Sequence, residues 1–480
     1  MATGTTYIHT LTTGELKTIL KALSVCTNPK DDFSDRLQIE TNPGLGLLKL
    51  YTETGGRCAR ATVACETIKK ARKLCVRFSA VAGFVGIEDA EKDTFDNNDA
   101  TIILDIRDGE LVLYGQGAAA RRSLKIPART DELLLPDFGP SAEVFGFSLE
   151  SAQGFAAKLD AVARAAYPGE EHAALNGVCL RYNGNGETLT LCACDRRQAA
   201  EFETAYDEDN SNIPDKDGKC DALLALPHVA ALKKALKVAD EKSGLEVAMI
   251  GLNGDGRPGE ELRDESMPSP MPEGKNGEDE AVENRFSHEN EATGARFSQG
   301  ETELSPRHEI PRVEFEFRTK AMAQVVLALP VSTAKFPNLE SLFEKYTKCP
   351  GTSVTRVDSE VLAGMLEQMQ KALRKKNMSA KLDFSKFPKK PEIYLSDAHG
   401  EYEAVLPATN ILQDEIPEDA RDSRFNPEVL AGALAAFGGG NVCLCFNDNA
   451  PTQVMLTQPD DEHRPLVSKH RRIITGQKRA

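Results

Sequence analysis

The chain has 480 residues, of which 40% are hydrophobic and 28% are charged, and it carries a net charge of −16 at pH 7. Its length predicts about three domains, at the usual size of roughly 150 residues each. The acidic balance argues against a simple basic nucleic-acid-binding protein, although a basic face could be enclosed within a ring. No apolar run reaches the roughly 18 residues of a transmembrane helix. The N-terminus lacks the basic and apolar regions of a signal peptide, so we expect a cytoplasmic protein.

Residues 1–140 are interpreted as one domain in which helices alternate with groups of strands. Thr13-Gly14-Glu15 opens an amphipathic segment, because leucine and isoleucine recur at helical spacing between residues 16 and 23. A second helix is expected over 76–87, although two glycines there lower its helix propensity. Strands are expected at 36–41, 47–54, 58–64, 101–106, 110–114 and 120–126.

Residues 141–347 repeat this plan as a second domain. A helix is expected over 151–167, and another begins at Pro227, where the missing N–H of proline costs nothing. Strands are expected at 145–149, 178–182, 189–193, 223–226, 245–250 and 313–318.

A segment of different composition interrupts the second domain. Residues 254–306 contain fourteen acidic residues against five basic ones and are rich in Gly, Pro, Ser and Asn. Such a segment buries too little apolar area to offset its chain entropy, so we expect it to be disordered. Because strand patterning resumes at 313, the segment is interpreted as an insertion within a domain.

Residues 348–480 repeat the plan a third time and end in a short C-terminal tail. Helices are expected over 359–376 and 426–437, the second ending at Gly438-Gly439-Gly440. Strands are expected at 381–383, 392–396, 402–406, 442–446, 453–456 and 466–470.

The sequence offers little support for catalysis, a metal or a cofactor. The eight histidines form no zinc motif, and no phosphate-binding loop or C-x-x-C occurs. Acidic residues at 207–210 and 215–218 lack the twelfth-position Glu of a calcium loop, which favours an acidic hairpin loop. The eleven cysteines are interpreted as buried thiols. We therefore expect no catalytic residues, no metal ligands and no cofactor.

A β-hairpin over 172–200 carries the most distinctive motif. Leu175-Asn176-Gly177 opens it, Asn183-Gly184-Asn185-Gly186 supplies a turn that tolerates positive φ, and Cys194-Asp195-Arg196-Arg197 closes it. Lys335-Phe336-Pro337-Asn338 follows later, and Phe446-Asn447-Asp448-Asn449-Ala450-Pro451 fits a loop near the C-terminus. In order and spacing, these motifs resemble the bacterial DNA polymerase III sliding clamp, the β subunit of the replicative polymerase.

This resemblance implies an α+β fold of three repeated clamp domains, with helices lining the interior of a ring and antiparallel sheets outside. It implies a processivity factor that encircles duplex DNA as a head-to-tail homodimer and tethers a replicative polymerase, without chemistry of its own. Alternatives are a clamp-like paralogue or a non-encircling scaffold in DNA repair, and, third, an enzyme on the same fold. A trimeric ring also stays open.

The resemblance also assigns two groups of site residues. The partner pocket, which in the family receives peptides from polymerase and clamp loader, would be lined by Leu175, Cys194, Arg196, Arg197, Gln198, Ala199, Pro337, Leu342 and Val467. The two arginines at its rim would favour an acidic peptide. Cations on the helices would face the DNA phosphates: Lys17, Lys21, Lys158, Arg164, Lys233, Lys234, Lys237, Lys371, Arg374 and Lys375.

Overall fold

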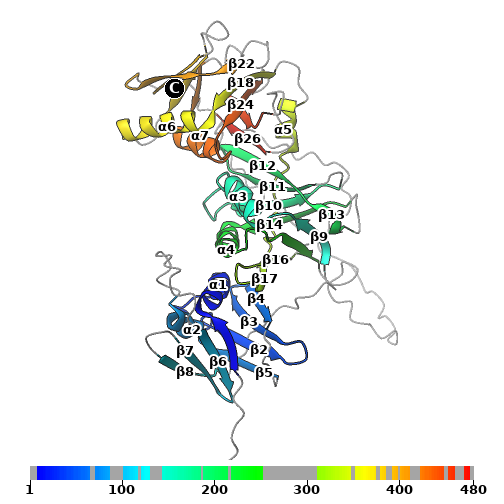
Figure 1. Ribbon diagram of the computed structural model, residues 1–480. Coiled ribbons are helices and arrows are strands. Elements are labelled where there is room, and N and C mark those ends of the chain that lie inside the picture. The colour runs from blue at the N-terminus through cyan, green and yellow to red at the C-terminus, as the bar shows by residue number, and fades with distance from the viewer. Residues whose placement is uncertain are drawn as a thin grey trace, which may run out of the picture.

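A computed structural model gives the fold of the chain (Figure 1). It describes residues 8–64, 71–86, 101–116, 121–129, 143–184, 188–213, 218–251, 311–347, 352–374, 379–384, 392–397, 400–410, 422–447, 452–459 and 470–475. The predicted insertion at 254–306 lies outside the described residues, as do Lys375 and Val467.

The elements repeat one order three times: a strand, a helix and three strands, then a strand, a helix and three strands again. In repeat 1 the first helix begins with a capping box, in which the Thr12 hydroxyl and the Glu15 carboxylate each accept a backbone N–H of the other residue. The elements of repeat 1 are β1 (Ile8–Thr12), α1 (Thr13–Leu23), the 3₁₀ turn η1 (Ser24–Cys26), β2 (Leu37–Asn42), β3 (Leu47–Thr54), β4 (Arg57–Ala64), β5 (Arg72–Val76), α2 (Phe78–Val85), β6 (Thr101–Arg107), β7 (Glu110–Gln116) and β8 (Arg121–Pro127).

Repeat 2 follows the same order with one added strand, β13. The acidic segment at 207–210, predicted to be a hairpin loop, instead forms β13 on the edge of a sheet, where its charged side chains stay exposed. The elements are β9 (Glu143–Leu149), α3 (Ala152–Ala163), β10 (Gly177–Tyr182), β11 (Thr188–Cys194), β12 (Gln198–Ala205), β13 (Asp207–Asn212), β14 (Cys220–Ala225), α4 (Leu226–Leu236), β15 (Leu245–Ile250), β16 (Arg312–Arg318) and β17 (Gln324–Pro330).

A short helix that the sequence did not predict, α5 (Glu340–Thr347), precedes repeat 3. Both helices of repeat 3 begin at side-chain caps, Asp358 for α6 and Asn426 for α7. The elements are β18 (Thr352–Asp358), α6 (Ser359–Leu373), β19 (Ala380–Asp383), β20 (Glu392–Asp397), β21 (Glu403–Pro407), β22 (Thr409–Asn410), β23 (Asp422–Phe425), α7 (Pro427–Ala435), β24 (Asn441–Asn447), β25 (Gln453–Thr457) and β26 (His470–Thr475).

Antiparallel strand pairs join the repeats edge to edge. Repeat 1 meets repeat 2 where β4 pairs with β17, and repeat 2 meets repeat 3 where β12 pairs with β26. Both joints lie inside nine-stranded sheets, of order β13-β9-β15-β16-β17-β4-β3-β2-β5 and β14-β10-β11-β12-β26-β25-β24-β18-β22. In the two four-stranded sheets, β8 ends the order β1-β6-β7-β8 and β21 begins the order β21-β20-β19-β23. Thus the strands equivalent to those at the joints lie at sheet edges in repeat 1, as β8, and in repeat 3, as β21.

Helices α1, α2, α3, α4, α6 and α7 lie on one side of the sheets, and the main apolar core fills the space between these helices and the sheets. Figure 1 shows α6, α7, α3, α4, α1 and α2 following one another down the molecule. One core cluster of buried side chains runs through repeats 1 and 2, and a second fills repeat 3. Within the described residues, no helix is long and apolar enough to cross a membrane. The predicted α+β plan of three repeats is confirmed.

Candidate functional site

A third apolar cluster, here called the joint cluster, lies between repeats 2 and 3. Strands of both repeats contribute to it, and so does the segment that connects them. Four residues predicted for the partner pocket meet here: Cys194 and Ala199 inside the cluster, and Leu175 and Leu342 partly buried against it, together with Ala334. The buried members are Cys179, Cys192, Cys194, Ala199, Leu223, Phe336, Leu339, Phe343, Cys443, Cys445, Met455 and Ile473.

Two arginines hold the connecting segment in place. The Arg181 guanidinium lies 5.7 Å from the centre of the Phe336 ring and bonds Asp221 at 2.8 Å. The Arg471 guanidinium lies 4.6 Å from the centre of the Phe343 ring. Because these phenyl groups are fixed from both repeats, the partly buried Pro337 and Leu342 occupy defined positions beside the joint.

The Leu-Asn-Gly motif has a structural reason at each position. The Asn176 amide donates to the carbonyls of Tyr167 and Gly169, at 3.1 and 3.0 Å, and so ties the end of α3 to the hairpin. Gly177 pairs with Ala225 on β14, and any Cβ there would overlap the carbonyl oxygen of Leu224. Leu175 is thereby held at the surface of the joint cluster.

The turn at 195–198 is braced internally. One oxygen of the Asp195 carboxylate accepts the backbone N–H groups of Arg197 and Gln198, at 2.6 and 2.7 Å. The Asp195 N–H donates to the carbonyl of Gln198 at 2.9 Å. Arg196 and Arg197 are consequently presented to solvent, whereas Gln198 is half-buried.

Sequence reasoning missed Arg472, which lies beneath this turn. Its guanidinium is fully buried and donates to the Ala161 carbonyl and to the Gln198 side-chain oxygen, both at 3.2 Å. Burial and the nearby Arg164 lower the pKa of Arg472 to about 10. A run of basic residues near a chain end gives no sign that one of them is buried, so only the tertiary structure identifies it.

The described cysteines are inert structural thiols. All nine are buried thiols, as expected. Desolvation raises the pKa of Cys194 and of Cys220 to about 12, so neither is a thiolate near neutral pH. In the part of the chain that the structure describes, no group of three or more His, Cys, Asp or Glu side chains could hold a metal ion.

The predicted DNA-facing cations divide into two groups. In the first group, Asp160 holds two of them, because its carboxylate bonds both Arg164 on α3 and Lys233 on α4. Burial opposes ionisation of Asp160, but the bonds to Lys233 and Arg164 prevail and lower its pKa. Lys158 donates to Thr204 at 2.8 Å and lies over the Phe202 ring, while Lys371 pairs with Glu367 at 3.3 Å. Each of these four cations is therefore already bonded to another side chain of the same chain.

The second group makes no ion pair to any described residue. Lys234, Lys237 and Arg374 are exposed, whereas Lys17 and Lys21 are half-buried. Since α1 packs against α4, lysines of repeats 1 and 2 are carried on neighbouring helices. This second group, Lys17, Lys21, Lys234, Lys237 and Arg374, is called the free cations below.

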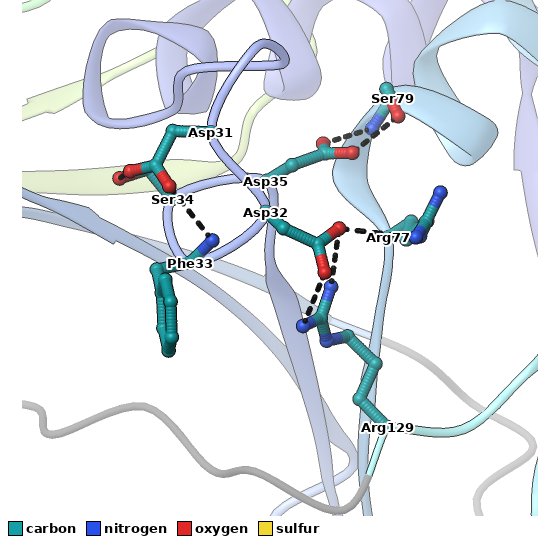
Figure 2. A network of polar contacts seen from close by, with 8 residues as sticks. All are labelled: Asp31, Asp32, Phe33, Ser34, Asp35, Arg77, Ser79 and Arg129. Carbon is teal, nitrogen blue, oxygen red and sulfur yellow. Dashed lines mark hydrogen bonds and ion pairs between the residues drawn. The ribbon is translucent and has the colours of Figure 1, made fainter.

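A polar network braces one end of repeat 1 (Figure 2). The Asp32 carboxylate bonds Arg77, just before α2, at 3.0 Å and Arg129, just after β8, at 3.3 Å. Asp35 caps α2 from a distant loop, because its carboxylate accepts the backbone N–H of Ser79 at 2.7 Å. The network ties α2 to the end of β8, the edge strand.

No protein-family model matches the sequence, and no curated protein matches it. Solved structures do match. The DNA polymerase III β subunit of Thermotoga maritima is 17% identical, with a TM-score of 0.62 over 98% of this chain and all of that one. A putative β subunit of Eubacterium rectale is 8% identical, with a TM-score of 0.64 over 98% of this chain and all of that one. The Helicobacter pylori β clamp, solved with a DNA ligase peptide, is 12% identical, with a TM-score of 0.62 over 98% of this chain and all of that one. The chain therefore has the fold of the bacterial DNA polymerase sliding clamp.

Proposed function

We propose that this protein is a DNA sliding clamp, a ring that encircles duplex DNA and tethers a replicative polymerase and other partners. The observation that carries the proposal is the pair of edge strands β8, in repeat 1, and β21, in repeat 3, in a chain whose two internal joints are both antiparallel strand pairs. If β8 of each copy pairs with β21 of the other copy, the two chains close into a ring. The contacts between the copies would then be antiparallel strand pairs, like the joints within each chain.

The side chains at these edges support such an association. Arg122 and Lys125 are exposed on β8, and Glu403 is exposed on β21, so the two strands carry opposite charge. Val405 on β21 and Val361 on α6 are 46% and 43% exposed, so they offer apolar surface near this edge. The Asp32 network would support this interface by fixing the end of β8.

The helices supply the surface for DNA. In a closed ring they would line the interior, and the free cations would contact phosphates without reading the base sequence. The strongly acidic remainder of the chain would stay outside, which reconciles a net charge of −16 with binding a polyanion.

The partner site would lie at the exposed edge of the joint cluster. Leu175 and Leu342 offer apolar surface there for a leucine or phenylalanine of a partner peptide, with the turn at 195–198 as its rim. The Helicobacter pylori clamp was solved with a peptide of DNA ligase, which is the kind of ligand proposed here. In this proposal the chain itself is non-catalytic, cytoplasmic and divided into domains at about residues 140 and 347.

The mass in solution tests the ring. We expect light scattering to give about 105 kDa, twice the chain mass of 52.3 kDa. Val405→Arg should yield monomers, because it places a cation against the basic β8 of the partner copy. Met322→Arg, at an exposed apolar residue in the turn before β17, is the matched control and should leave the mass unchanged. A wild-type mass near that of one chain at all concentrations contradicts the ring and favours a non-encircling scaffold. A mass three times that of one chain would indicate a trimeric ring.

A further inference from the structure

A single carboxylate lies among the cations on the helices of repeat 2. Figure 1 shows α3 and α4 as neighbours, and the two helices pack against each other. Over Ala152–Ala163 and Leu226–Leu236, which make up these helices, Asp160 is the only acidic residue. Its carboxylate bonds Arg164, one turn further along α3, at 3.0 Å, and it also bonds Lys233 on α4. One side chain therefore joins two predicted DNA-facing cations that come from different helices.

All three side chains of this group are within reach of solvent. The exposed fraction of the side chain is 46% for Arg164, 37% for Asp160 and 33% for Lys233. Ion pairs at such exposure are weak, because water screens the charges. A phosphate, like a carboxylate, can offer two oxygens to a guanidinium group. Asp160 and a DNA phosphate are therefore alternative partners for the same two cations.

Other cations on the helices are not restrained in this way. Lys234, also on α4, is exposed and makes no ion pair to a described residue. In repeat 1 the same holds for Lys17 and Lys21, although α1 also contains one acidic residue. That residue, Glu15, is used at the start of the helix, where its carboxylate accepts the Thr12 N–H at 2.7 Å. An acidic residue that caps a helix leaves the lysines free, whereas Asp160 bonds the cations themselves.

We infer that Asp160 is a positioning residue that competes with DNA phosphates for Arg164 and Lys233, and so keeps the contact of repeat 2 with DNA loose. The inference rests on the proposed function and adds a residue that sets the strength of the DNA contact. With Asp160 ionised, the three side chains together carry one positive charge instead of two. A phosphate gains a full contact only by displacing the carboxylate, so fewer counterions are released when the duplex binds. Weak contacts of this kind let a protein slide along DNA.

Duplex binding by the isosteric variant Asp160→Asn tests this inference. Fluorescence anisotropy with a short labelled duplex and the full-length protein gives the slope of log affinity against log salt. We expect this slope to steepen by about 0.9 for each cation released, and the affinity at about 50 mM salt to rise about tenfold. Asp160→Glu keeps the carboxylate and should resemble the wild type. Asp209→Asn makes the same change of charge on the exposed strand β13 and should leave the slope unchanged. If Asp160→Asn folds poorly, Asp160→Ala carries the same expectation.

A second background separates restraint of the cations from simple repulsion of DNA. In the variant Arg164→Gln/Lys233→Gln, adding Asp160→Asn should leave the slope unchanged, because no cation remains to be released. If it steepens the slope there as much as in the wild-type background, the carboxylate only repels phosphate and the inference is wrong.

The remaining outcomes separate this inference from the proposed function. If the wild type binds the duplex and Asp160→Asn has the same slope and affinity, the inference is overturned and the proposed function stands. If the wild type binds no duplex at any salt concentration, the DNA surface of the proposed function is wrong, and the inference is wrong with it.

Discussion

The imidazole of His470 in repeat 3 stacks on the phenyl ring of Phe202 in repeat 2, with ring centroids 4.5 Å apart and planes inclined by 22°. Phe437 covers the other face of the imidazole, with ring centroids 4.1 Å apart. Neither ring nitrogen of His470 has a hydrogen-bond partner among the described residues. The joint between the two repeats thus contains a fully buried, neutral histidine.

This histidine should make stability depend on pH. Burial, reinforced by the nearby Arg472, lowers the pKa of His470 from 6.5 to about 3. Below pH 6.5 the unfolded chain therefore binds a proton at His470 that the folded chain does not bind. The free energy of unfolding consequently falls as the pH falls towards 3. The loss should be roughly 1.4 kcal/mol per pH unit, or about 2 kcal/mol between pH 6.5 and pH 5. Denaturant unfolding of wild type and His470→Phe measures it, and an identical pH dependence in both would contradict it.

Leu342→Asp should abolish binding of a peptide from the cognate polymerase. The substitution puts a charge on the joint cluster and removes an apolar contact worth about 1.5–3 kcal/mol. Peptide titration beside sizing chromatography measures both binding and assembly, and assembly should be unchanged. Ser341→Asp adds the same charge to the exposed neighbouring position and should bind normally. Wild-type affinity in Leu342→Asp would move the partner site elsewhere.

Lys237→Gln should weaken duplex binding more than Lys371→Gln does. Lys237 is exposed without an ion pair to the described residues, whereas Lys371 is already paired with Glu367. Loss of one phosphate contact should reduce the slope of log affinity against log salt by about 0.9. Fluorescence anisotropy with a short labelled duplex over a range of salt gives this slope. Equal slopes for Lys237→Gln and the wild type would show that Lys237 does not contact phosphate.

Deletion of 254–306 should leave stability within about 1 kcal/mol of the wild type, or slightly higher, because shorter loops cost less closure entropy. Ile250 and Arg312 are direct partners in the pairing of β15 with β16, so the chain leaves and re-enters the sheet at one place. Residues 251–253 and 307–311 remain to connect the two strands. Urea unfolding of the shortened chain tests this, and a loss of several kcal/mol would mean that the segment is packed structure.

Gly177→Ala should destabilise the protein by about 1–3 kcal/mol, because the added Cβ would overlap the Leu224 carbonyl and push β10 from β14. Gly364→Ala is the control. It lies inside α6 with open space around a new Cβ, so it should stabilise by up to about 1 kcal/mol. Thermal unfolding of the two variants should therefore shift in opposite directions, and equal shifts would show that Gly177 has room for a side chain.

Local patterns predicted most helices and strands, since their signals lie within a few residues. The spacing of apolar residues over 16–23 gave α1, and the expected helix at 76–87 appears as α2 over Phe78–Val85. The distant cap from Asp35 that helps α2 to start left no local signal. Strand β12 was missed although it pairs with the neighbouring β11, and its second partner, β26, lies far along the chain.

The sequence predicted where the residues of the candidate site lie better than it predicted their hydrogen bonds, ion pairs and burial. Leu175, Cys194, Ala199 and Leu342 do meet at one cluster. Sequence could not tell that Lys233 is paired with Asp160 while the adjacent Lys234 is exposed, because that depends on how α3 packs against α4. The last described strand, His470–Thr475, begins where the predicted strand at 466–470 was expected to end.

The strand-pairing joints of the proposed ring should differ in mechanical strength. The β12–β26 joint combines strand pairing with the aromatic stack at His470, and the Arg471–Glu201 bond of 2.5 Å crosses it. A covalent connection and the joint cluster reinforce it further. In a closed ring, the contact between β8 and β21 of two chains would have no such covalent link. Such a ring would open first at this contact between the two chains. A protein that loads the ring onto DNA would therefore have to act there.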